Sequence, residues 1–75
     1  MRFIETFKDG DRISDVYLCK SKSTALTKTG KEYENVMLAD KTGQIDSKIW
    51  DVNSGIGDFD VNDYVYVSGQ VTSYN

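Results

Sequence analysis

The sequence predicts an all-β protein, folded as a small Greek-key barrel of four strands. Apolar and polar residues alternate with a period of two along most of the chain, which is typical of strands with one buried face. Six glycines separate these segments, and proline is absent. Seventy-five residues make at most one domain, so we expect residues 1–75 to form a single unit.

The first two strands are expected at residues 12–22 and 33–39. Their core-facing side chains are predicted to be Val16, Leu18, Val36 and Leu38, with Ile13 nearby. On the second strand, the opposite face carries Tyr33, Asn35 and Met37. A glycine-containing hairpin loop around residues 27–31 joins the two strands.

The third and fourth strands are expected at residues 44–50 and 63–74. One face of these strands is predicted to hold Ile45, Ser47, Ile49, Val65, Val67 and Val71. The other face is predicted to hold Gln44, Asp46, Lys48, Trp50, Tyr64, Tyr66, Ser68 and Gln70. A tight turn at residues 40–43 precedes the third strand, and Gly43 can supply a positive φ there. Residues 52–62 are expected to form an irregular loop.

Composition excludes several classes of function. Histidine is absent, which removes histidine acid–base catalysis, histidine-containing triads and histidine-ligated metals. One cysteine, Cys19, excludes an internal disulfide and a cysteine-rich zinc site. The aspartates between residues 51 and 63 do not fit a calcium loop. We therefore expect a non-catalytic, cytoplasmic domain with no metal, no cofactor and no membrane segment.

The net charge of −3 conceals a gradient along the chain. Residues 1–19 carry −1, residues 20–50 carry +2 through six lysines, and residues 51–75 carry −4. Proteins that bind nucleic acid attract its phosphates with clustered basic residues. Any nucleic-acid site is therefore expected in the middle of the chain, with modest strength.

One pattern of residues resembles a known family. Its parts are Tyr17-Leu18, Thr29-Gly30-Lys31-x-Tyr33, the run from Leu38 to Asp51, and Phe59-x-x-x-Asp63-Tyr64-Val65-x-Val67-x-Gly69-x-Val71. Together they resemble the OB-fold nucleic-acid-binding domain at the N-terminus of the YhaM-type bacterial 3′–5′ exoribonucleases. The L-x-D-x-x-G-x-I-x-x-x-x-W core, from Leu38 to Trp50, is shared with other OB-folds, including tRNA-anticodon-binding domains.

The resemblance implies an OB-type barrel with strand order 1-2-3-5-4-1. The family has glycine where this chain has Asn62, a residue that tolerates the left-handed conformation well. The family also continues into a fifth strand and an HD-type hydrolase domain, so we expect a C-terminally truncated piece of a larger exoribonuclease. Strands three and four would then present open edges, through which the fragment is expected to self-associate.

The candidate nucleic-acid-binding residues are Trp50, Lys48, Tyr33, Tyr66, Lys31, Lys28 and Asn35. OB-folds bind oligonucleotides on the face of strands two and three, where aromatic rings stack on bases and lysines follow the backbone. Each residue also has a structural interpretation: Trp50 packs against the 52–62 loop, the tyrosines pair across strands, and the lysines are solvated surface.

The favoured function is binding of single-stranded nucleic acid, RNA before DNA, with little sequence preference, in the service of a downstream catalytic domain. The alternative is a protein–protein interaction or oligomerisation module of the parent enzyme. The acidic residues between positions 51 and 63 favour that alternative.

Overall fold

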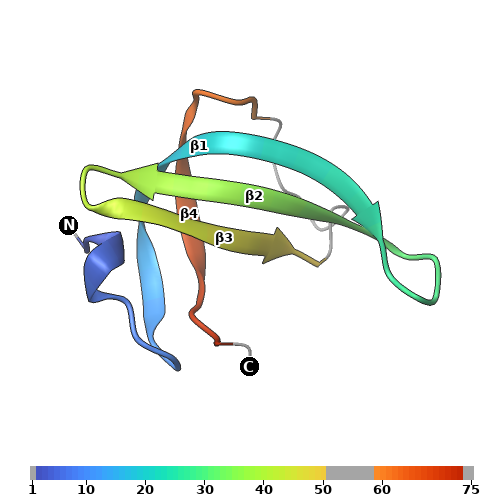
Figure 1. The fold of residues 1–75 in the computed structure, drawn as a ribbon, viewed down its shortest axis with the longest axis horizontal. Helices are drawn as coiled ribbons and strands as arrows, with labels where there is room; N and C mark the ends of the chain where they lie inside the picture. The colour runs from blue at the N-terminus through green and yellow to red at the C-terminus, as the bar shows by residue number, and fades with distance from the viewer. Residues whose placement is uncertain (1, 51–58, 74–75) are drawn as a thin grey trace.

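A computed structural model describes residues 2–50 and 59–73, and it confirms the all-β prediction. One short 3₁₀ helix, η1 (Ile4–Thr6), precedes four strands. These are β1 (Arg12–Leu26), β2 (Glu32–Asp40), β3 (Gly43–Ile49) and β4 (Tyr64–Gln70). They form one antiparallel sheet in the order β3-β2-β1-β4 (Figure 1). This agrees with the order expected for four strands of the barrel.

Strand β1 is the long central strand, and it is bent in the middle. Its first half pairs with β4, from Arg12 opposite Gln70 to Leu18 opposite Tyr64. Its second half pairs with β2, and the register shifts between Cys19 and Ser21. Such a bulge adds a residue to one strand and increases its local twist. Figure 1 shows the result: β4 and the first half of β1 run steeply across the direction of β2 and β3.

The core lies on the concave side of this curled sheet. Its buried side chains are Ile4, Ile13, Tyr17, Cys19, Val36 and Leu38. Partly buried side chains from β3 and β4 pack against them, namely Ile45, Ile49, Val65 and Val67. The inward faces predicted for strands two, three and four are therefore confirmed.

The face predicted for the first strand is wrong. Val16 is 40 % exposed and Leu18 is half-buried, whereas Tyr17 and Cys19 are buried. Two contacts explain why Tyr17 is accommodated inside. Its hydroxyl donates a 2.6 Å hydrogen bond to the carbonyl of Arg2, and its ring meets the ring of Phe7 edge to face at 5.8 Å. A satisfied hydroxyl and a large ring make tyrosine a good core residue here.

Two turn predictions had different outcomes. Asn62 adopts a φ of 76°, so the left-handed position expected there is confirmed. Gly43 has no positive φ, and that prediction is wrong. The 40–43 turn is instead shaped by the Asp40 side chain, whose Oδ1 accepts hydrogen bonds from the amides of Thr42 and Gly43. Most of the predicted irregular loop, residues 52–58, lies outside the described residues.

The N-terminal segment is fastened to the sheet by polar contacts. The amide of Ile4 donates to Asp40 Oδ2 at 2.8 Å, and the amide of Arg2 donates to Asp15 Oδ2 at 2.8 Å. These bonds hold the Ile4 side chain in the core. Within residues 2–50 and 59–73, no helix is long and apolar enough to cross a membrane.

Candidate nucleic-acid interface

Two aromatic rings form a pair at one end of the outer face of β2 and β3. The β2–β3 register places Asn35 opposite Lys48, and continuing it by two residues along each strand places Tyr33 opposite Trp50. The ring centroids of Tyr33 and Trp50 lie 4.9 Å apart, with an angle of 39° between the planes. Trp50 remains 53 % exposed. We call this pair the aromatic platform, because an exposed ring beside a partly exposed one, here Trp50 beside Tyr33, offers a surface on which a base can stack.

Lys48 lies beside the platform, and it is already engaged by neighbours. Its ammonium donates to Asn35 Oδ1 across the strands and to Asp46 Oδ2 at 3.0 Å along its own strand. Its side chain is 26 % exposed. Asp46 therefore offsets part of the positive charge that the sequence placed here, and Asn35 fixes the direction of the ammonium.

Lys28 and Lys31 lie in the hairpin loop between β1 and β2, next to Tyr33 along the chain, and both are exposed. The loop is ordered by its own bonds: the Thr27 hydroxyl accepts from the Lys31 amide at 3.1 Å, and Gly30 adopts a φ of 84°. Both lysines are thus carried on a defined turn that adjoins the aromatic platform.

Tyr66 is not part of this cluster. It stands on β4, opposite Val16 of β1, and its side chain is 69 % exposed. Strand β4 is separated from β2 and β3 by β1 in the sheet. The structure therefore brings together Trp50, Tyr33, Lys48 and Asn35, adds Lys28 and Lys31 on the adjoining loop, and leaves Tyr66 on a different part of the surface.

Lys22 is not among the candidate binding residues that the sequence offers, and the bulge in β1 explains its position. The register shift places Lys22 opposite the buried Val36, so it faces inward. Its ammonium donates to the carbonyl of Phe59 at 2.8 Å, lies 4.3 Å from the Phe59 ring centroid, and is 3.9 Å from Glu34 Oε1. Without the bulge, the alternation that buries Tyr17 and Cys19 would turn Lys22 outward.

Cys19 is fully buried, as a structural rather than reactive thiol would be. Burial raises the pKa of its thiol. The nearby charge of Lys22 lowers this pKa, and the carboxylates of Asp63, Asp60 and Glu34 raise it. A thiol with a raised pKa holds little of the nucleophilic thiolate at neutral pH.

Comparison with known proteins finds similarity to bacterial exoribonucleases. The chain is 30% identical over 74 residues to the 3'-5' exoribonuclease YhaM of Halalkalibacterium halodurans, covering 97% of this chain and 23% of that protein. It is 29% identical over 69 residues to the protein of the same name from Listeria monocytogenes serotype 4b, covering 91% and 22%. For the Geobacillus sp. protein of that name, the identity is 34% over 47 residues, covering 63% and 14%.

The chain thus spans about a quarter of the length of the first of these relatives. No protein-family model matches it, and no solved structure gives a significant match. The similarity therefore relates this chain to a short part of proteins named as exoribonucleases.

Proposed function

We propose that this chain is an OB-type barrel that binds single-stranded nucleic acid, RNA in preference to DNA, without strong sequence preference. The observation that carries the proposal is the aromatic platform: Tyr33 and Trp50 lie 4.9 Å apart on the surface, beside Lys48. Every base has a face that can stack on such rings, and this makes the contact tolerant of sequence.

The surrounding polar groups suit the backbone of a single strand. Lys28 and Lys31 on the loop, with Lys48 beside the platform, supply cations for phosphates, and Asn35 offers an amide for base or ribose edges. RNA is the favoured ligand because the similar proteins carry the name exoribonuclease. We further propose that residues 1–75 form one domain that binds the nucleic-acid substrate and delivers it to a catalytic domain of the same protein.

Replacing Trp50 tests the proposal directly. Trp50→Ala is expected to weaken binding of a labelled ten-nucleotide oligoribonucleotide by about 1–3 kcal/mol, because a stacked base loses its partner. Trp50→Phe serves as the matched control, since it retains an aromatic face and should retain much of the affinity. Fluorescence anisotropy at low salt measures both, and circular dichroism checks the fold. Equal affinity of Trp50→Ala and wild type, with matching spectra, would exclude the platform as the binding surface.

The lysines are tested through salt. Lys31→Glu combined with Lys48→Glu is expected to lower the affinity and to flatten its dependence on salt concentration, since each lost phosphate contact reduces the slope by about 0.7 for a single strand. Lys8→Glu combined with Lys20→Glu, two exposed charge reversals away from the platform, changes the net charge by the same amount and controls for it. A slope that changes equally in the two proteins would mean that overall charge alone is responsible.

A second function, assembly with other chains, is supported by the edges of the sheet. In the described part of the chain, β3 and β4 each pair with one neighbour only. Their inward residues Ile45, Ile49 and Val65 are only partly buried. An open edge carries unpaired N–H and C=O groups and recruits further strands. Light scattering over a wide concentration range tests this: self-association supports it, and a monomer throughout excludes it.

A further inference from the structure

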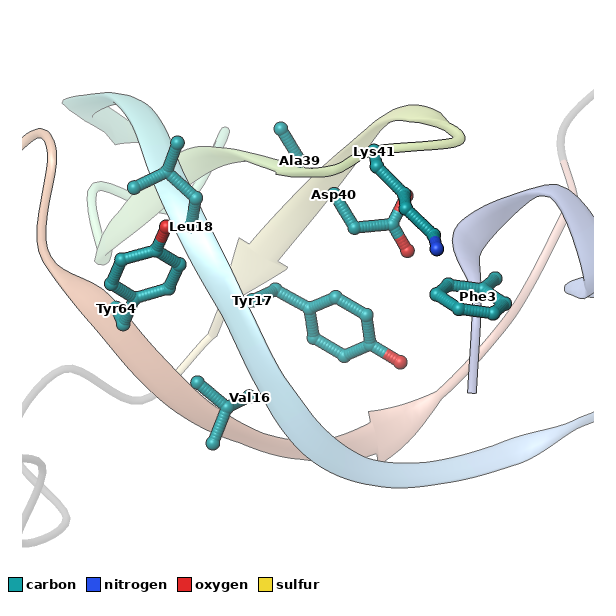
Figure 2. A pocket seen from close by; sticks show the side chains of 8 residues that line it. All are labelled: Phe3, Val16, Tyr17, Leu18, Ala39, Asp40, Lys41 and Tyr64. Carbon is teal, nitrogen blue, oxygen red and sulfur yellow. The ribbon is translucent and has the colours of Figure 1, made fainter. Parts of the chain in front are cut away.

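An open hollow of about 600 Å³, shown in Figure 2, lies where β2 ends at Ala39 and Asp40. The aromatic platform, which includes Tyr33, lies at the start of the same strand. The lining of the hollow comes from four parts of the chain and includes Phe3, Ala39, Asp40, Lys41 and Tyr64. Small-molecule sites usually measure about 300–1,000 Å³, so the hollow has room for a nucleotide. None of its lining residues belongs to the interface proposed above.

The chemistry of the lining is that of an aromatic site with one cation. Figure 2 shows Phe3 and Tyr64 on opposite sides of β1, with the Lys41 side chain extending toward Phe3. The Lys41 ammonium lies 4.9 Å from the Phe3 ring centroid, and Tyr64 is 77 % exposed. Ala39 adds a short, buried side chain to the lining.

The aspartate carboxylates near the hollow accept hydrogen bonds from backbone amides. Asp40, which also lines it, accepts hydrogen bonds from Ile4, Thr42 and Gly43. Asp15 and Asp63 adjoin the lining along the chain and accept from the amides of Arg2 and Asp60. Of the described residues that line the hollow, Lys41 supplies the positive charge and is exposed to an incoming ligand.

The outer face of β2 connects the hollow to the aromatic platform. Side chains at alternate positions of a strand share a face, so Tyr33, Asn35, Met37 and Ala39 form one row. The row begins at the platform and ends at the hollow, six residues later. At about 3.3 Å per residue, its length is about 20 Å. Lys31 lies near its start and Lys41 just past its end, and the neighbouring strand β3 places Lys48 opposite Asn35 and Asp46 opposite Met37.

We propose that the hollow is a second nucleotide subsite, which takes a base against Tyr64 and the adjoining phosphate at Lys41. The same single strand reaches it from the platform along the outer row of β2. This inference rests on the proposed function and extends it, because it gives the bound strand a path and an upper limit to the number of nucleotides that the path holds. A strand stacked as in a duplex advances about 3.4 Å per nucleotide, so a 20 Å path takes at most about six nucleotides.

The inference predicts that the effect of a mutation depends on oligonucleotide length. Oligouridylates of three and eight nucleotides, each with a fluorescent label, are titrated against four proteins: wild type, Trp50→Ala, the double variant Lys41→Gln/Tyr64→Ala, and Tyr66→Ala. Both residues of the double variant are exposed, so the fold should be retained. Tyr66→Ala is the matched control, as it removes a tyrosine of the same strand with similar exposure, 69 % against 77 %, which lies opposite Val16 but does not line the hollow.

The double variant is expected to bind the octamer about fivefold or more weakly than wild type and to bind the trimer equally well. Trp50→Ala is expected to weaken both, and Tyr66→Ala neither. If wild type and Trp50→Ala show this behaviour but the double variant binds the octamer normally, the second subsite is refuted and the platform stands. If Tyr66→Ala matches the double variant, the hollow has no special role. If wild type binds neither oligonucleotide, the proposed function fails together with the inference.

Discussion

Removal of the Asp40 carboxylate is expected to destabilise the protein more than any exposed substitution. Oδ1 accepts from the Thr42 amide at 2.7 Å, the Thr42 hydroxyl at 2.6 Å and the Gly43 amide at 3.2 Å. Oδ2 accepts from the Ile4 amide at 2.8 Å. The carboxylate therefore joins the N-terminal segment to the β2–β3 turn, two parts of the chain that are far apart in sequence.

The size of this loss in stability depends on which of the lost hydrogen bonds water can replace. In Asp40→Ala the amides of Thr42 and Gly43 can turn to water, whereas the amide of the buried Ile4 is left without a partner. Together these losses amount to about 2–4 kcal/mol. A domain of this size has a free energy of unfolding of about 4–11 kcal/mol in total. The melting temperature should therefore fall by about 10–30 °C.

The effect should also depend on pH. Burial works to raise the pKa of Asp40, but hydrogen bonds from Thr42, Ile4 and Gly43 outweigh it, and the pKa is lowered from its ordinary value of 3.8. A lowered folded-state pKa gives stability that is fully present above the unfolded value and is lost as the pH falls through the folded value. The gap between wild type and Asp40→Ala should thus be widest near neutral pH and narrow below about pH 4.

Urea unfolding followed by circular dichroism, at pH 7 and at pH 3, measures this gap. Asp46→Ala is the matched control, because Asp46 is also an aspartate beside a β2–β3 pair but has a side chain that is 59 % exposed. Its stability should stay within about 0.5 kcal/mol of wild type. A wild-type urea midpoint for Asp40→Ala at pH 7, or a gap of constant size at both pH values, would refute the reasoning.

Two further predictions concern binding and backbone geometry. Asp46→Asn removes the carboxylate that pairs with Lys48, so the affinity for single-stranded RNA should rise and its salt dependence should steepen. Fluorescence anisotropy at several salt concentrations measures both. An unchanged slope would count against Lys48 as a phosphate contact. Asn62→Ala should cost about 1–2 kcal/mol because alanine resists the φ of 76°, whereas Asn62→Gly should be close to neutral; equal melting temperatures for the two variants would contradict this.

Alternation predicted three of the four strand faces because β2, β3 and β4 are short and regular. Val36 and Leu38, for example, are buried as expected, and Tyr64 and Tyr66 are exposed as expected. For strand β1, the same alternation predicted the wrong face. It placed the aliphatic Val16 and Leu18 inside instead of Tyr17 and Cys19. Tyr17 is accommodated inside through a hydrogen bond to a carbonyl fifteen residues away. Long-range partners of this kind leave no trace in local periodicity.

The positions of some candidate residues could also be predicted from the sequence. Alternation along the strand places Trp50 and Lys48 on one face, whereas the pairing of Tyr33 with Trp50 requires the strand register, which the structure supplies. The interaction of Lys48 with Asp46 was missed, because charges two residues apart on a strand were counted separately instead of as neighbours. The hollow at the other end of β2 was also missed, since Phe3 and Lys41 reach it from distant segments.

The divided pairing of β1 has a consequence for the order in which the protein folds. The second half of β1 pairs locally, as Leu26 lies opposite Glu32 only six residues later, and β3 follows β2 through a tight turn. The first half of β1, up to Leu18, pairs with β4, whose residues lie far along the chain, as Leu18 pairs with Tyr64. Closing a short loop costs less entropy than closing a long one. The β1–β2–β3 meander should therefore form early and β4 should dock last. In hydrogen exchange, the amides of β2 that bond to β1 should consequently outlast those of β4.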